Sequence, residues 1–131
     1  MLHIPRSLLV VCLLILVLAS GCNWGNGSTP LSAAKSALRL LQAKDYEGLV
    51  NQFMEPELLA KELKKNGSIE KVAEQVARVA DRIETALAEA VKTTPKYSED
   101  GSRAVFELSN PHHYRDEITF IKISDRWYIE N

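Results

Sequence analysis

Hydrophobic and polar residues follow three successive patterns along this chain of 131 residues. An unbroken apolar run occupies residues 8–19. Apolar residues then recur every three or four positions from residue 31 to residue 91, which is the spacing of amphipathic helices. From residue 94 onwards they alternate with polar residues, as in strands with one buried face. The sequence therefore predicts a leader, a group of helices and an antiparallel sheet, in that order.

The periodic part predicts four helices. We expect the first over residues 30 to about 43, a short second helix whose apolar face spans residues 46–53, a short third helix from Pro56 to the Asn66-Gly67 pair, and a fourth over residues 68 to about 91. Thr29 is the predicted N-cap of the first helix, with Pro30 at a position where its missing N–H costs nothing. Asp45 is the predicted cap of the second helix, and Asn66-Gly67 is expected to end the third. The fourth helix carries the longest apolar stripe, which we expect to pack on the sheet of its own domain. A coiled coil with a partner is the alternative interpretation.

The alternating part predicts an antiparallel meander. Its expected strands are residues 94–98, 103–108, 117–123 and 127–130. Asp100-Gly101 is a strong hairpin signal between the first two strands, and Ser124-Asp125-Arg126 is the predicted turn between the last two. Ala104, Phe106 and Leu108 should share one face of their strand. Helices followed by an antiparallel sheet define the α+β class.

Residues 1–21 have the features of a cleaved leader. The start is weakly basic, and the apolar run is shorter than the roughly 20 residues that a membrane span needs. Leu18-Ala19-Ser20-Gly21-Cys22 closes that run with small residues before a cysteine. This arrangement resembles a bacterial lipoprotein signal, which implies that Cys22 becomes the first mature residue and carries lipid. An ordinary secretory peptide is the alternative.

The resemblance implies a lipid-anchored protein of the bacterial cell envelope, with the membrane as a partner. Two or three acyl chains on Cys22 would anchor it firmly. Residues 22–29, rich in Gly, Asn and Ser, are expected to form a flexible linker to a domain over residues 30–131. Asn23 occupies the position after the cysteine where Asp would favour the inner membrane, so we expect the outer membrane.

The domain itself resembles small NTF2-like lipoproteins of the cystatin-like superfamily, whose function is unknown. The resemblance is carried by the order of the elements and by residues 30–34, 45–49, 98–106 and 121–129. It implies N-terminal helices packed on a curved antiparallel sheet, a cone whose open end is a pocket in ligand-binding and catalytic members. No Asp or His of this chain matches a catalytic position of the enzyme members. The resemblance therefore implies a fold more than an activity.

Composition narrows the function classes. The chain has 16 basic and 17 acidic residues, a balance that argues against a nucleic-acid partner. Its two cysteines are Cys12, inside the leader, and Cys22, so lipidation leaves the mature domain without a thiol. No Gly-rich phosphate loop, nucleophile elbow, HExxH or CxxC motif occurs. We therefore expect no cofactor.

His112, His113 and Asp116 are the most suggestive chemical group in the sequence. Imidazole and carboxylate ligands suit zinc or copper, and a histidine could serve as a general base. These residues fall in or beside a predicted loop, however, without the fixed i,i+4 pair of a helical metal site. We expect solvated loop residues, no metal site, and no rise in melting temperature with zinc.

Two further groups of side chains have an ordinary structural interpretation. The strand aromatics are Tyr97, Phe106, Trp127 and Tyr128. Alternation should turn half of them into the core, and the others are candidates to line a concave pocket. A basic cluster on the third helix consists of Lys61, Lys64 and Lys65. We expect a solvated face there, with contact to anionic lipid head groups as the alternative.

The sequence thus predicts a non-enzymatic module that binds a small ligand or an envelope protein, with no catalytic residues. A hydrolase-like or isomerase-like enzyme that uses the pocket of the cone is the alternative. A deep cavity with two or more converging ionisable side chains would favour the enzyme. A pocket filled by apolar side chains would favour a structural or protein-binding role.

Overall fold

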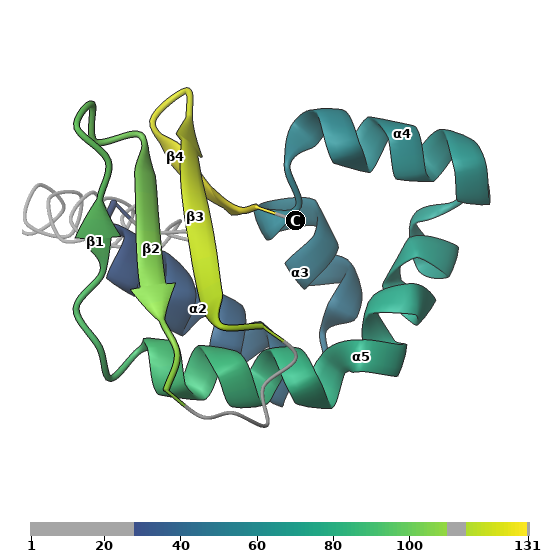
Figure 1. Ribbon diagram of the computed structural model, residues 1–131. Helices are drawn as coiled ribbons and strands as arrows, with labels where there is room; N and C mark the ends of the chain where they lie inside the picture. The colour runs from purple at the N-terminus through teal and green to yellow at the C-terminus, as the bar shows by residue number, and fades with distance from the viewer. Residues whose placement is uncertain (1–27, 110–114, 131) are drawn as a thin grey trace, which may run out of the picture.

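The computed structural model describes residues 28–109 and 115–130, which form an α+β arrangement of helices and one sheet (Figure 1). The elements are α2 (Pro30–Gln42), α3 (Tyr46–Phe53), α4 (Pro56–Asn66), α5 (Ile69–Ala90), β1 (Lys96–Tyr97), β2 (Arg103–Glu107), β3 (Glu117–Ile123) and β4 (Arg126–Ile129). Helices followed by an antiparallel sheet are confirmed. The predicted leader and Cys22 lie outside the described residues. Within them, no helix is long and apolar enough to cross a membrane.

The helix boundaries follow the predicted caps. The Thr29 hydroxyl accepts a hydrogen bond from the Ser32 N–H at 3.1 Å, and the Asp45 carboxylate accepts one from the Gly48 N–H at 2.9 Å. Gly67 ends α4 with a φ of 89°, a left-handed conformation that glycine adopts without a steric cost. Because each cap satisfies backbone groups that the helix leaves unpaired, short-range sequence signals fix where these helices start and stop.

The sheet is an antiparallel meander in the order β1-β2-β3-β4. β1 is shorter than the predicted strand over residues 94–98, since Pro95 has no N–H to contribute to a ladder. The predicted turn at residues 124–126 is also wrong by one residue. Ser124 and Asp125, with φ of 50° and 64°, form a two-residue turn, and Arg126 already belongs to β4.

The hairpin between β1 and β2 is held by Asp100. Its carboxylate accepts hydrogen bonds from the Ser102 N–H at 3.0 Å and from the Ser102 and Ser98 hydroxyls, each at 2.7 Å. These bonds stabilise the charged form, the bond from the Ser102 N–H most of all, and lower the pKa of Asp100 to about 2. The carboxylate therefore stays ionised at neutral and mildly acidic pH and pins the turn.

One face of the sheet packs against α2 and α5 and forms the core. Helix α2 contributes small buried side chains, including Ala33, Ala34 and Ala37, which allow a close approach. The largest buried side chains opposite them are Phe106, Phe120 and Trp127. Phe106 and Phe120 meet edge to face with ring centroids 5.8 Å apart. Figure 1 shows the sheet lying in front of α2, with α5 below both.

Helix α5 packs mainly on other helices. It lies against α2 and α3 along much of its length, while its contacts with the sheet are fewer and involve β3. The expectation that its apolar stripe packs on the sheet is therefore only partly met. The stripe extends over 22 residues, more than a four-stranded sheet can cover, and its N-terminal half needs α3 and α4 as neighbours.

Half of the strand aromatics belong to the core cluster, as predicted, namely Phe106 and Trp127. The prediction did not include the burial of Tyr128. Phe106, Trp127 and Tyr128 are all buried, and Tyr97 is 56 % exposed. Trp127 and Tyr128 are neighbours on β4 and so face opposite sides of the sheet. Tyr128 is nevertheless buried. Arg126 lies over its ring at 5.7 Å, and the Arg103–Glu130 ion pair crosses the outer face from β2 to the end of β4. Alternation thus correctly predicted that Trp127 and Tyr128 face opposite sides of the sheet, but it did not predict that both side chains are buried.

Candidate functional site

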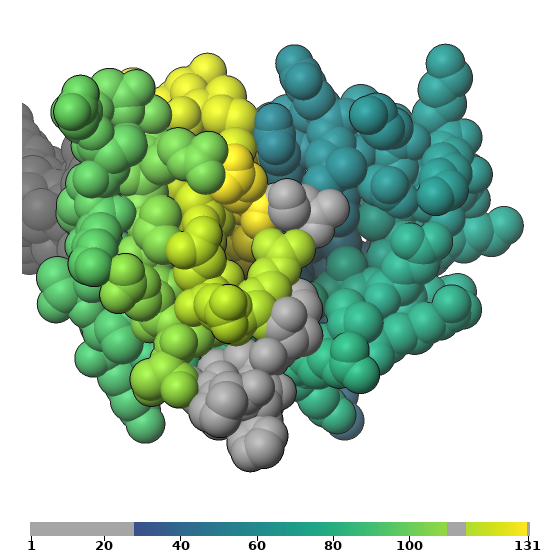
Figure 2. Space-filling view, viewed as in Figure 1, coloured from purple at the N-terminus to yellow at the C-terminus, as the bar shows by residue number. Residues whose placement is uncertain are grey.

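A groove opens where α3, α4 and α5 meet the end of β4. Its volume is about 350 Å³. Its apolar walls include Val50, Phe53, Leu58, Val72, Val76 and Ile129. In the space-filling view the surface is hollowed between the sheet and these helices (Figure 2). The volume is at the lower end of the roughly 300–1,000 Å³ that small-molecule sites occupy in proteins.

The groove exists because the chain changes direction at both ends of α4. After α3, Met54 is extended and pairs with Ile129 of β4 in an isolated parallel bridge. Pro56 then begins α4, and Gly67 reverses the chain into α5. The extended segment separates α4 from α3, so α4 contacts the rest of the domain chiefly through α5 (Figure 1). No residue of α4 is buried, and its leucines are half-buried.

A polar network fixes the corner between α4 and α5. The Gln75 side-chain amide donates to the Asn66 oxygen at 2.6 Å. The Asn66 amide in turn donates to the Glu62 carbonyl at 2.9 Å and to the Glu62 carboxylate at 3.0 Å. Glu62 and Gln75 both line the groove. This end of the groove is therefore polar and structurally braced.

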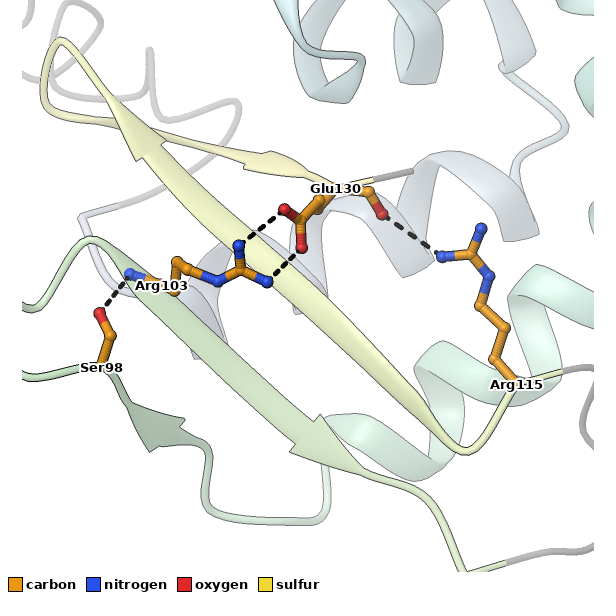
Figure 3. Close-up of polar contacts among 4 residues, drawn as sticks. All are labelled: Ser98, Arg103, Arg115 and Glu130. Atoms are coloured by element: carbon orange, nitrogen blue, oxygen red, sulfur yellow. Dashed lines mark hydrogen bonds and ion pairs between the residues drawn. The ribbon is translucent and has the colours of Figure 1, made fainter.

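Another part of the groove lining is formed by the end of β4 and by Arg115, two residues before β3. Arg115 donates to the Glu130 carbonyl at 3.4 Å, while the Glu130 carboxylate accepts two hydrogen bonds from Arg103, at 2.9 and 2.7 Å (Figure 3). Figure 3 shows the Glu130 side chain turned toward Arg103 and its backbone carbonyl turned toward Arg115. Arg82 of α5 also lines the groove and is exposed.

Four ionisable side chains thus line the groove, but its two carboxylates are engaged with neighbours. Glu62 accepts from Asn66, and Glu130 forms a two-bond ion pair with Arg103 on the outer face of the sheet. Neither carboxylate is paired with a nucleophile or a histidine in the described residues, an arrangement that acid–base or nucleophilic catalysis would need. The chemistry of the groove is that of apolar contact with a charged rim.

Among the candidates from the sequence, Asp116 is described by the structure and does not line the groove. Asp116 is exposed, and its backbone carbonyl accepts from the Leu108 N–H at 2.8 Å; His112 and His113 lie outside the described residues. In the ranges that the structure describes, no three His, Cys, Asp or Glu side chains are grouped closely enough to hold a metal ion. The cluster of Lys61, Lys64 and Lys65 on α4 is exposed, as a solvated face requires.

The groove residues were not recognised as a site from the sequence. Val76 and Val79 belong to the predicted stripe of the long helix, and such a stripe is ordinarily interpreted as core packing. Val79 is in fact 41 % exposed beside the groove. One available signal was length, since the stripe extends beyond what the predicted meander could cover.

Comparison of the chain with protein-family models, with curated proteins and with solved structures gave no match. The geometry of the groove is therefore the observation from which a function is inferred.

Proposed function

We propose that this protein is a lipid-anchored protein of the bacterial envelope whose domain binds an apolar ligand in the groove between α3, α4 and α5. The observation that carries the binding role is an open groove of about 350 Å³ with predominantly apolar walls. Apolar surface exposed to water in a concave site is stabilised when a ligand covers it.

The anchor is proposed from the sequence that ends at Cys22. A lipidated Cys22 would hold the domain close to a bilayer through residues 22–29, within reach of apolar molecules that partition into membranes. The NTF2-like architecture is part of the same proposal. It is supported by helices that precede a meander and by the packing of α2 and α5 on one face of that sheet.

The geometry favours binding over catalysis. Both groove carboxylates accept hydrogen bonds from fixed neighbours, which positions them for structural roles. The size of the groove favours a small molecule, because a volume near the lower limit for drug-sized ligands suits one apolar chain or ring system. A protein partner and an enzymatic role are the alternatives that the experiment below separates from it.

The proposal is tested with the full chain in phosphatidylcholine vesicles and a photoreactive long-chain alcohol, an uncharged apolar probe. Mapping the crosslinked peptides by mass spectrometry should place the label on α3, α4 and α5. Val76→Glu should lower this labelling by about tenfold, since an unpaired carboxylate in an apolar wall opposes an apolar ligand.

The matched control is Ala77→Glu, which adds the same charge at the next position of α5 but on an exposed residue outside the groove. It should leave labelling unchanged. Val79→Glu, at a more exposed groove position, serves as a second test if Val76→Glu does not fold. Labelling spread evenly over the surface, or unaffected by both groove variants, would contradict the binding role.

A further inference from the structure

We infer that the ligand of the groove carries an uncharged hydroxyl head group, which donates a hydrogen bond to Glu62, and one apolar chain that lies along α5. This inference rests on the proposed function and specifies the ligand class of the same site. It is drawn from the direction of the hydrogen bonds at the corner between α4 and α5, where Glu62 and Gln75 line the groove.

The hydrogen bonds of this corner run in one direction. The Glu62 carbonyl and the Glu62 carboxylate can only accept, so the Asn66 side chain must turn its amide nitrogen toward them, at 2.9 and 3.0 Å. The Asn66 oxygen then faces Gln75 and accepts from the Gln75 amide nitrogen at 2.6 Å. Each amide is thereby oriented by its partner, and the chain of donors ends at the Glu62 carboxylate.

The corner retains acceptors that a ligand can use. Both N–H groups of the Asn66 amide are engaged with Glu62. Glu62 Oε2 accepts one of these bonds, whereas Glu62 Oε1 and the Gln75 carbonyl oxygen accept none from the part of the chain that the structure describes. Because Glu62 is half-buried, its carboxylate is only partly hydrated. A hydroxyl that donates to this carboxylate would form a charge-assisted hydrogen bond.

The surrounding charges favour an uncharged head group over an ion. The Glu62 carboxylate repels an anion. An ammonium group would meet the net positive charge of α4, which carries three lysines, Lys61, Lys64 and Lys65, against two glutamates, Glu57 and Glu62. A hydroxyl donates to the carboxylate without bringing a second charge into an apolar groove.

The apolar chain follows α5 away from this corner. Beyond Gln75 the lining of the groove continues along α5 with Val76, Val79 and Ile83, and Arg82 beside them is exposed to solvent. Ile83 is eight residues beyond Gln75, and a helix rises about 1.5 Å per residue, so this stretch extends over about 12 Å. One polar corner and one apolar stretch match a single-chain lipid with a hydroxyl head group, such as a long-chain alcohol or a monoacylglycerol.

The experiment uses the full chain in phosphatidylcholine vesicles with four photoreactive probes of equal chain length. They end in a hydroxyl, a methyl ether, a carboxylate or an ammonium group. The ether is the decisive comparison, because its oxygen cannot donate a hydrogen bond. At equal amounts of membrane-bound probe, the alcohol should label the groove peptides about fivefold more than the ether, since lost hydration partly offsets the bond to the carboxylate. The two charged probes should label less than the alcohol.

Glu62→Leu should abolish the preference for the alcohol over the ether, because it deletes the acceptor, and should leave ether labelling unchanged. Leucine is a good helix former, and the Asn66 amide keeps its bond to the carbonyl of residue 62. Glu62→Gln, which offers a donor as well as an acceptor, should lower the preference and decides the test if Glu62→Leu does not fold. The matched control Glu57→Leu removes an exposed carboxylate of α4 outside the groove and should change no probe.

Three results would overturn the inference, and they differ in what they leave standing. Equal labelling by alcohol and ether, or a preference that survives both Glu62 variants, would refute the hydroxyl contact but keep an apolar groove. A charged probe that labels the groove more than the alcohol would refute the uncharged head group. Failure of all four probes to label the groove would refute the binding role as well.

Discussion

Glu130 connects three parts of the molecule. Its side chain pairs with Arg103 of β2, its N–H donates to the Thr119 carbonyl at 2.9 Å, and its carbonyl accepts from Arg115. The end of the sheet is thereby fixed beside the groove. Arg103 lies half-exposed in this pair, so we assign it a positioning role and not a large share of stability.

A second residue with a structural role of its own is Trp127, which lies in the core. It is 3 % exposed and meets Tyr97 edge to face with ring centroids 6.5 Å apart. Trp127→Ala should lower the free energy of unfolding by about 3–5 kcal/mol, because it empties a large buried site. Urea unfolding followed by circular dichroism measures this loss. The control Tyr97→Ala removes a largely exposed ring and should cost much less. Equal effects of the two variants would show that Trp127 is not a core residue.

Among the helices, α4 is the one described without a buried residue. Six residues of α2 are buried, whereas none of α4 is, although Leu58, Leu59 and Leu63 give it an apolar face. Its stability depends on the corner with α5 and on whatever covers that face. Elements with few buried contacts open locally at low free energy, and ligand-binding segments are commonly of this kind.

Hydrogen exchange tests this difference directly. Backbone amides of α4 should exchange faster than those of α2, because opening α4 exposes little core. Binding of a long-chain alcohol should slow exchange in α4 and leave α2 unchanged, since α4 borders the groove and α2 does not. Exchange of α4 as slow as that of α2 would contradict the local opening. Mass spectrometry of pepsin fragments gives both readings.

At the scale of the whole molecule, the proposed lipid anchor would hold the groove close to the membrane surface. A tether of a few residues after Cys22 would confine the domain to the membrane surface, close to apolar molecules that partition into the bilayer. The proposed location and the proposed ligand therefore support each other, although each depends on a different observation.

The anchor is tested by labelling cells with palmitate. In a bacterial host the wild-type chain should incorporate the label and fractionate with membranes. Cys22→Ala should lose the label, because the other cysteine, Cys12, lies inside the predicted leader and does not follow the small residues of the signal. Cys12→Ala is the matched control, since Cys12 lies within the predicted leader and should be dispensable. A label retained in Cys22→Ala would refute the lipoprotein proposal.

The sequence by itself determined the α+β class, the order of the elements and most of their boundaries. Helix caps such as Thr29, Asp45 and Gly67 interact with residues only a few positions away, so they can be predicted from the sequence alone. The structure confirms all three. Periodicity likewise predicted β3 at Glu117–Ile123. These features are local in sequence and need no knowledge of distant contacts.

Only the tertiary structure decided the groove and the burial of the aromatics. Whether Val76 faces a core or a groove depends on where α4 is placed, and that follows from the bridge between Met54 and Ile129, residues far apart in the chain. Tyr128 is buried by residues on the outer face, against the simple alternation. The Arg103–Glu130 pair joins positions 27 residues apart. Periodicity assigns a side chain to one face of an element, but the elements that meet that face are fixed by long-range packing.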